Sequence, residues 1–294
     1  MRPAPDILCI GSALWDTIGR AKIAVRPGMD IPGRIRRQPG GVALNIAITL
    51  ARLGMRPALL TSVGRDAEGD ALVAEAARLG LDTASVFRDA TRPTDRYMAV
   101  EGTNGLIAAI ADAHTLEAAG EAILAPLADG RLGSAAAPWR GPVVLDGNLT
   151  AALLAVIAAS PLFAAADLRI APASPGKAAR LAPLLGHPRA TLYVNLEEAS
   201  ILAGASFSGA EDAARGLVAA GATRALVTDG ARAAADAGAA GTIAALPPRV
   251  PETRVTGAGD TFMAAHIVAE ARGARRSAAL RDALAAAAAF VAGS

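Results

Sequence analysis

The sequence predicts an α/β protein in which helices cover both faces of a mainly parallel sheet, with a small second sheet beside it. Short apolar runs such as Ile7–Gly11 and Val143–Leu145 alternate with longer segments of helical character. This alternation continues over most of the chain and favours a parallel sheet in three α/β/α layers. Two regions rich in hairpin signals, roughly Lys22–Gln38 and Thr94–Ala111, break the alternation, and we expect them to form the small sheet.

Composition limits the classes of function. With 53% hydrophobic and 3% aromatic residues, the core must consist mainly of Ala, Val, Leu and Ile. A net charge of +2, with no block of basic residues, argues against nucleic acid as a partner. The single cysteine, Cys9, excludes an internal disulfide framework and fits a reducing compartment. Since we find neither a secretory signal nor an apolar stretch long enough to span a bilayer, we expect a cytoplasmic protein with no membrane partner.

The first third of the chain predicts a strand, a glycine-rich turn and a helix. Asp16 follows the strand Ile7–Gly11 on a loop, and Gly40-Gly41 come directly before a helix that turns Leu44 inward. Asn45 lies one turn into this helix. Its amide suits sugar hydroxyls, but the spacing equally allows an exposed polar residue.

Strands and helices continue to alternate after this helix. We expect a strand over Ala58–Val63, a helix over Asp66–Leu79 and a strand over Ala84–Phe87. Gly102-Thr103-Asn104-Gly105 is a strong turn signal and predicts a hairpin between Thr94–Val100 and Leu106–Ala111.

The second half of the chain repeats the pattern with short loops. Because no linker is visible, we expect one domain over residues 1–294, with lid strands drawn from about 12–38 and 94–111. The remaining elements that we expect are strands at Val143–Leu145, Leu168–Ala171, Thr191–Val194 and Ala225–Thr228, helices at Thr150–Ala158 and after Pro175, a β-rich stretch to Pro247, and two final helices.

One segment near the C-terminus indicates chemistry. Thr256-Gly257-Ala258-Gly259-Asp260 comes before a run with good helix propensity, and Thr256 is a plausible N-cap. The glycines leave the backbone N–H groups of the turn uncovered, and a helix N-terminus attracts anions. Asp260, in the first turn, is either a simple capping carboxylate or the base of a phosphoryl-transfer site.

This segment resembles the anion hole and catalytic base of the ribokinase-like (PfkB) sugar and nucleoside kinases. Gly40–Ala47 with Leu53-Gly54 is similar to the N-terminal signature of that family, and Val63-Gly64-Arg65-Asp66 with Gly69 continues it. Asn195-Leu196-Glu197-Glu198 resembles the Asn-x-x-Glu motif of the family, and Val227–Gly230 its strand end beside the nucleotide. Taken singly, the last two segments also fit a helix start and an ordinary turn.

The resemblance implies a role for each matching residue. Asp260 would be the base, and the N–H groups of the Gly257–Asp260 turn would form the anion hole. Glu198 would hold Mg²⁺ through water, which suits an ion that keeps most of its waters. The other implied contacts are Asp16, Gly40, Gly41 and Asn45 for the acceptor substrate, and Asn195, Thr228, Gly230, Thr256, Gly257 and Gly259 for the nucleotide.

Within the family, the sequence is most similar to the pseudouridine kinases. The resemblance therefore implies ATP and Mg²⁺ as cofactors, the 5′-hydroxyl of a nucleoside as acceptor, and pseudouridine as the first substrate to test. It also allows a K⁺ site, near Arg254, and a homodimer formed through the lid. The residues expected to accept the extra ring N–H of pseudouridine are Thr94, Asn104 and Asp112.

Other functions stay open. The same resemblance allows a kinase for ribose, adenosine or a fructose-type sugar, or a nucleoside-binding protein without turnover. Other chemistry has little support, since Gly176-Lys177 lacks the earlier glycine of a Walker A loop and no Gly-x-Ser-x-Gly segment occurs. The three histidines show no metal-ligand spacing.

Overall fold

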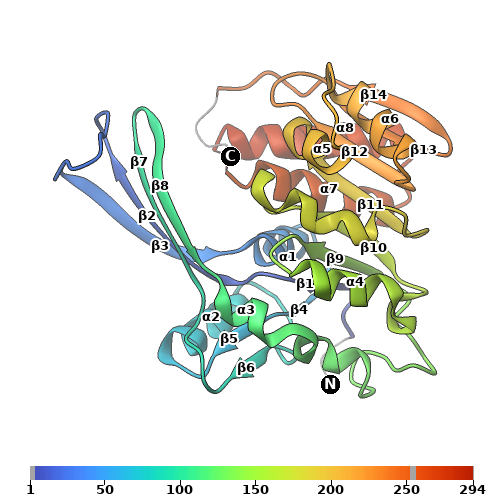
Figure 1. Ribbon diagram of the computed structural model, residues 1–294, viewed down its shortest axis with the longest axis horizontal. Coiled ribbons are helices and arrows are strands. Elements are labelled where there is room, and N and C mark those ends of the chain that lie inside the picture. The colour runs from blue at the N-terminus through green and yellow to red at the C-terminus, as the bar shows by residue number, and fades with distance from the viewer. Residues whose placement is uncertain (1–3, 252–255, 294) are drawn as a thin grey trace.

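The computed structural model describes residues 4–251 and 256–293 (Figure 1). Within them, eight strands form a central sheet in the order β14-β13-β12-β11-β10-β9-β1-β4. The strands from β4 to β12 in this order are parallel, and β13 and β14 are antiparallel to their neighbours. The strands are β1 Ile7–Ile10, β4 Pro57–Leu60, β9 Pro142–Asp146, β10 Asp167–Ala171, β11 Ala190–Asn195, β12 Arg224–Thr228, β13 Ala234–Gly238 and β14 Gly241–Ala245.

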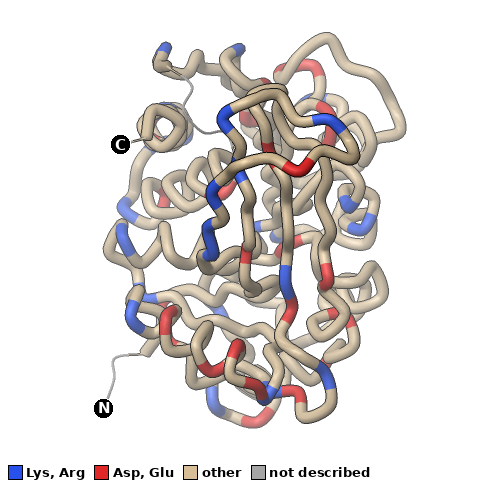
Figure 2. The backbone as a smooth tube through the Cα atoms, turned by 90° about the vertical axis from the view of Figure 1, so that its left-hand side faces the viewer, with Lys and Arg blue, Asp and Glu red and all other residues tan. Residues whose placement is uncertain are grey.

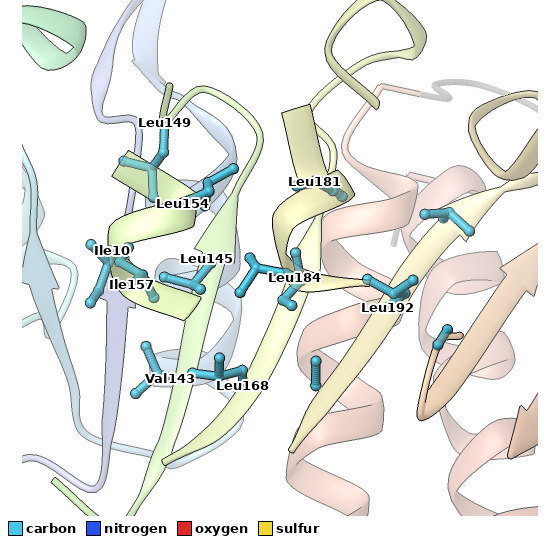
Figure 3. Close-up of a cluster of buried hydrophobic side chains, with 14 of the residues drawn as sticks. Ile10, Val143, Leu145, Leu149, Leu154, Ile157, Leu168, Leu181, Leu184 and Leu192 are labelled. Carbon is cyan, nitrogen blue, oxygen red and sulfur yellow. The ribbon is translucent and has the colours of Figure 1, made fainter. Parts of the chain in front are cut away.

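Helices cover both faces of this sheet, as the sequence predicts. Alternate residues of β1 enter two separate cores, Leu8 and Ile10 on one side and Ile7 and Cys9 on the other. Figure 3 shows the first core, in which Ile10 of β1 lies near Ile157 of the covering helix α4, Ala151–Ala159. The helices on that side are α3 His114–Ala119, α4 Ala151–Ala159, α5 Leu196–Ala203 and α6 Ala210–Ala219, with 3-10 helices at Gly120–Leu127, Pro161–Phe163 and Pro175–Leu184. The helices on the other side are α1 Val42–Arg52, α2 Ala67–Arg78, α7 Ala258–Ala271 and α8 Arg276–Val291.

A second sheet, which we call the lid, projects from one side of the molecule (Figure 1). It consists of β3 Gly33–Gly40, β2 Leu14–Ala21, β7 Arg96–Gly102 and β8 Gly105–Asp112, in this order across the sheet. The hairpin predicted around Gly102–Gly105 is therefore confirmed, and both predicted lid regions contribute strands.

The two faces of the lid differ in their surroundings. Trp15 lies on one face, where its ring nitrogen donates to the carbonyl of Glu68 in α2. Since side chains alternate along a strand, Asp16 lies on the opposite face, and Tyr97 of β7 is its partner in register. The charges of Asp16 and Asp260 influence each other, which places the Asp16 face toward α7.

Some predictions differ from the observed elements. Asp16, expected on a loop, lies within strand β2. The strand predicted over Ala58–Val63 breaks at Thr61, and β5 Ser62–Gly64 pairs with β6 Phe87–Asp89 in a separate small sheet. The strand predicted over Ala84–Phe87 is therefore displaced toward Asp89. The helix predicted after Pro175 is a 3-10 helix, Pro175–Leu184, with Pro183 inside it. Among the described residues, no helix is both long and apolar enough to cross a membrane.

Candidate active site

The N-terminus of α7 is open. Gly257 is its N-cap with φ at 94°, and no side chain of the described residues caps this end of the helix. Thr256 lies one residue earlier, so its prediction as the N-cap is wrong. The first N–H groups of a helix have no partner within the helix, and a Cβ added to Gly259 would meet nothing within 4 Å. The N–H groups of Ala258, Gly259 and Asp260 therefore suit an anion approaching from outside.

At the N-terminus of α1, by contrast, side chains of the protein accept hydrogen bonds from the first N–H groups. Val42 N donates to Ser12 Oγ at 2.9 Å, and Ala43 N donates to Asp146 Oδ2 at 2.9 Å. Gly41, with φ at 98°, allows this turn to pack directly on the Ser12 backbone. The protein itself thus supplies the anion at α1, and an external phosphate fits α7 instead.

Asp260 lies in the first turn of α7 and is partly buried. Asn45 Nδ2 donates to Asp260 Oδ2 at 3.0 Å, across 215 positions of sequence. Burial raises the pKa of Asp260 to about 7; the Asn45 bond opposes this rise, whereas the charges of Asp146, Asp16 and Glu198 add to it. A carboxylate with a pKa near neutrality is well suited to accept a proton from a hydroxyl group.

Asp16 lies on the face of the lid that is turned toward α7. Burial raises its pKa to about 6. A Cβ added to Gly40, on the neighbouring strand β3, would overlap the Asp16 carboxylate. Glycine at position 40 therefore leaves room for the carboxylate, and together with Asn45 these residues form one end of the candidate site.

A buried polar cluster supports this end of the site, and sequence reasoning missed most of it. Asp146, fully buried at the end of β9, accepts hydrogen bonds from the backbone and hydroxyl of Ser12 at 2.9 and 2.7 Å. Asn148 donates to the same hydroxyl at 2.8 Å and accepts from Lys177 Nζ at 2.5 Å. Burial and the nearby Arg180 lower the pKa of Lys177. The Asp-Gly-Asn segment that follows an apolar strand is the signal that could have identified the cluster.

The other end of the site lies at the carboxyl ends of β11 and β12. A cleft of about 500 Å³ there is lined by residues that include Asn195, Thr228 and Gly230. Its position fits the rule that open parallel sheets bind ligands beyond the carboxyl ends of their strands. Three of the residues predicted to contact nucleotide are therefore brought together, and Phe207 adds an apolar side chain to the same cleft.

Asn195 and Glu198 form the start of α5. Asn195 Oδ1 accepts from Glu198 N at 2.9 Å, and Glu198 Oε2 accepts from Asn195 N at 2.8 Å. The helix-start interpretation of this segment is thus correct as local structure. Glu198 is also buried, and its pKa is raised by desolvation. A nearby cation would stabilise the charged form of this carboxylate, which burial and the charge of Glu197 disfavour.

The described residues contain no group of three or more His, Cys, Asp or Glu side chains able to hold a metal ion. A single carboxylate fits Mg²⁺, since this ion keeps several waters and binds substrate phosphates in kinase sites. The role of Glu198 in holding Mg²⁺ through water stays a prediction. The predicted K⁺ site near Arg254 lies outside the described residues.

Three residues predicted to recognise the base do not lie toward the site. Thr94 is buried, and its hydroxyl donates to Asp66 Oδ1 at 2.6 Å. The amide of Asn104 bonds both the N–H and the carbonyl of Val25 at the tip of the lid, at 2.9 Å each. Asp112 pairs in register with Arg96, in the row of Trp15, and so lies on the opposite face from Asp16. These three predictions are corrected because their side chains hold the protein together or face away.

Comparisons with known proteins agree with this geometry. The model of the pfkB family of carbohydrate kinases matches residues 4–294. A pseudouridine kinase of Escherichia coli is 31% identical over 277 residues, which cover 90% of this chain and 83% of that protein. A carbohydrate kinase from Agrobacterium tumefaciens has 28% identity and a TM-score of 0.79, with 97% of this chain and 90% of that chain covered. A ribokinase from Thermotoga maritima, at 21% identity, has a similar fold with a TM-score of 0.80 and coverage of 98% and 93%.

The fold, the open helix terminus beside Asp260 and these comparisons agree. The chain belongs to the pfkB family of carbohydrate kinases, whose members transfer phosphoryl groups to sugars or nucleosides.

Proposed function

We propose that this protein transfers the γ-phosphoryl group of ATP to the 5′-hydroxyl of a nucleoside, with pseudouridine as the preferred acceptor. The observation that supports it most is the position of Asp260, in the first turn of a helix whose N-terminus no described side chain caps, between two candidate ligand sites. Burial, which raises the pKa of Asp260 to about 7, adds to this support. The similarity to a pseudouridine kinase, at 31% identity, supports the choice of acceptor. All of residues 1–294 would act as one kinase domain in the cytoplasm.

Each end of the site has a defined task in this mechanism. Asp16 and Asn45 would hold the ribose hydroxyls, so that the 5′-oxygen lies beside Asp260. Asp260 would accept the proton of that hydroxyl as the oxygen attacks phosphorus. The N–H groups of Ala258, Gly259 and Asp260 would bind the charge that develops on the transferred group. Glu198 and Asn195 would hold Mg²⁺ through water, and the ion would neutralise the phosphate oxygens.

Base recognition needs a polar group on the face of the lid that carries Asp16. Pseudouridine differs from uridine by an exposed ring N–H, and a site that pairs this donor leaves its own acceptor unpaired with uridine. Tyr97 is the partner of Asp16 in register, so its hydroxyl is a candidate acceptor. Burial raises the pKa of Tyr97, with smaller contributions from Asp16 and Glu101, and the hydroxyl keeps its proton.

The lid also offers a surface for a second copy of this chain. Its face opposite Asp16 carries large apolar side chains that are well exposed, Ile35 at 78%, Ile110 at 63% and Met98 at 50%. Since an exposed apolar group of this kind favours association, it supports a homodimer formed through the lids. A measurement of the molar mass in solution tests directly whether the protein is a dimer.

An ATP-consumption screen tests the proposal. The acceptors would be pseudouridine, uridine, adenosine, ribose and fructose 6-phosphate, with Asp260→Asn protein as the control for background hydrolysis. We expect kcat/KM for pseudouridine at least about tenfold above that for uridine, equivalent to ~1.4 kcal/mol of transition-state binding. Faster phosphorylation of adenosine or a free sugar would overturn pseudouridine as the preferred acceptor, but the protein would still be a kinase. Binding of nucleoside without any turnover would instead indicate a sensor.

A further inference from the structure

A second cleft lies at the amino ends of the central strands, whereas Asp260 lies near their carboxyl ends. It has a volume of about 450 Å³, and Arg169, Arg189, Arg224 and Arg276 are among its lining residues; we call it the arginine cleft. Its walls include the first residues of β10, β11 and β12, whereas the candidate nucleotide cleft lies at the last residues of β11 and β12. Strands of this length, at ~3.3 Å per residue, separate the two clefts by roughly 15–20 Å.

Charges in the arginine cleft do not balance. Asp167 and Glu270 bind Arg169 at 2.6 and 2.5 Å. Asp236, which is fully buried, binds Arg224 and Arg276 at 2.7 Å each.

These three carboxylates therefore match three arginines. Arg189 is the fourth: its Nε donates to the carbonyl of Ala166 at 3.0 Å, and no carboxylate within the described part of the chain pairs with it. The cleft thus carries surplus positive charge.

The end of α8 adds to this surplus. Arg276 is the first residue of α8 and Arg275 is its N-cap, and the first turn holds no acidic residue and no side-chain cap. A helix N-terminus carries partial positive charge, so cations placed there are unfavourable and anions are favourable. The four arginines and this helix end converge on the same cleft, and a guanidinium group is the side chain best suited to bind phosphate.

We propose that the arginine cleft is a second, non-catalytic binding site for a small phosphorylated metabolite. The volume is sufficient for a phosphate group with an attached sugar. The same arginines reach α7, since Glu270 binds both Arg169 and Arg224, at 2.5 and 2.7 Å. A ligand in the cleft therefore contacts a network that includes the helix whose first turn holds Asp260.

Isothermal titration calorimetry tests this site with both ends of the catalytic site filled, the nucleotide end by Mg²⁺ and a non-hydrolysable ATP analogue and the acceptor end by pseudouridine. The probes are inorganic phosphate and ribose 5-phosphate, titrated into wild-type protein, Arg189→Glu and Arg215→Glu. Arg215 is the matched control, because it is an exposed arginine on α6 that pairs only loosely with Glu211, at 3.8 Å. Both substitutions change the net charge equally, and both positions are exposed, so the variants are expected to fold.

Wild-type protein and Arg215→Glu should bind at least one probe with one saturable site, and Arg189→Glu should bind at least tenfold more weakly. The probe should also raise the Tm of the wild-type protein and leave that of Arg189→Glu unchanged, because a ligand that binds only the folded state stabilises it. Absence of saturable binding in the wild type, or equal weakening in both variants, would overturn the proposal.

Discussion

Replacing Asn45 by alanine should change the pH at which the enzyme works. Asn45 Nδ2 donates to Asp260 Oδ2 at 3.0 Å, and this bond favours the charged form of a carboxylate whose pKa burial has raised to about 7. The proposed base must be ionised to accept a proton. Loss of the bond therefore raises the pKa of Asp260 and moves the rise of activity to higher pH.

The size of the change follows from the strength of the bond. A hydrogen bond to a charged group contributes about 1.5–3 kcal/mol, and 1.36 kcal/mol corresponds to one pKa unit. Since Asp260 is partly exposed, we take the lower part of this range, a shift of about one unit. At pH 7 the ionised fraction would fall from about one half to about one tenth, which lowers kcat/KM about fivefold beyond the loss of the sugar contact. Above about pH 9 this pH-dependent part disappears, and the ratio of kcat/KM between the two proteins becomes constant.

The assay is the pH profile of kcat/KM, which reports the pKa of the free enzyme. Thr49→Val is a matched control: Thr49 lies one turn further along α1 and its hydroxyl bonds the carbonyl of Asn45 at 3.0 Å. Its profile should match that of the wild type. If Asn45 only holds sugar hydroxyls, kcat/KM of Asn45→Ala would fall by the same factor at every pH, and this result would refute the reasoning.

Three further outcomes follow from the geometry of the site. Asp16→Ala should weaken acceptor binding by about 1.5–3 kcal/mol and leave ATP binding unchanged in calorimetry, whereas equal losses would indicate a structural role. Gly257→Ala should lower the unfolding free energy by about 1–3 kcal/mol, because φ is 94° and a Cβ would lie 2.9 Å from Phe290. Gly259→Ala should leave denaturant unfolding unchanged yet reduce turnover. Greater destabilisation by Gly259→Ala than by Gly257→Ala would contradict these roles. The raised pKa of Asp260 means that the folded state retains a proton that the unfolded state loses, so this group's contribution to stability is lost as pH rises through about 7. The full shift from 3.8 to about 7 would correspond to ~4 kcal/mol, and solvent reduces this because Asp260 is partly exposed. Asp260→Asn should therefore be more stable than wild type by about 1–2 kcal/mol at pH 8 and similar at pH 4, and a stability difference independent of pH would count against the raised pKa.

The sequence predicted the layers of the fold because they depend on local patterns. Runs such as Ile7–Ile10 are apolar at every position, and this is what a strand buried on both faces requires. The break at Thr61 was not predictable in the same way, because Ser62–Gly64 leaves the central sheet to pair with Phe87–Asp89, a partner chosen by tertiary contacts. The apolar run itself carries no sign of that change.

The candidate site was predictable where one short segment carries it and not where distant segments meet. The segment Gly257–Asp260 is sufficient by itself to predict an open helix N-terminus. The contact of Asn45 with Asp260 joins residues 215 positions apart, and no periodicity predicts it. Asp112 was misplaced for a different reason: the β-bulge between Val100 and Glu101 and the register of β8 decide which face its side chain occupies.

The central claim is that Asp260 removes the proton from the acceptor hydroxyl, and its most direct test is the kcat of Asp260→Asn at saturating ATP and acceptor, with ATP affinity measured on the same protein. Asparagine keeps the shape of the side chain but cannot accept that proton. We predict that kcat falls by roughly 10²-fold or more while the Kd for ATP stays close to that of the wild type. Near-wild-type turnover in the variant would contradict the account.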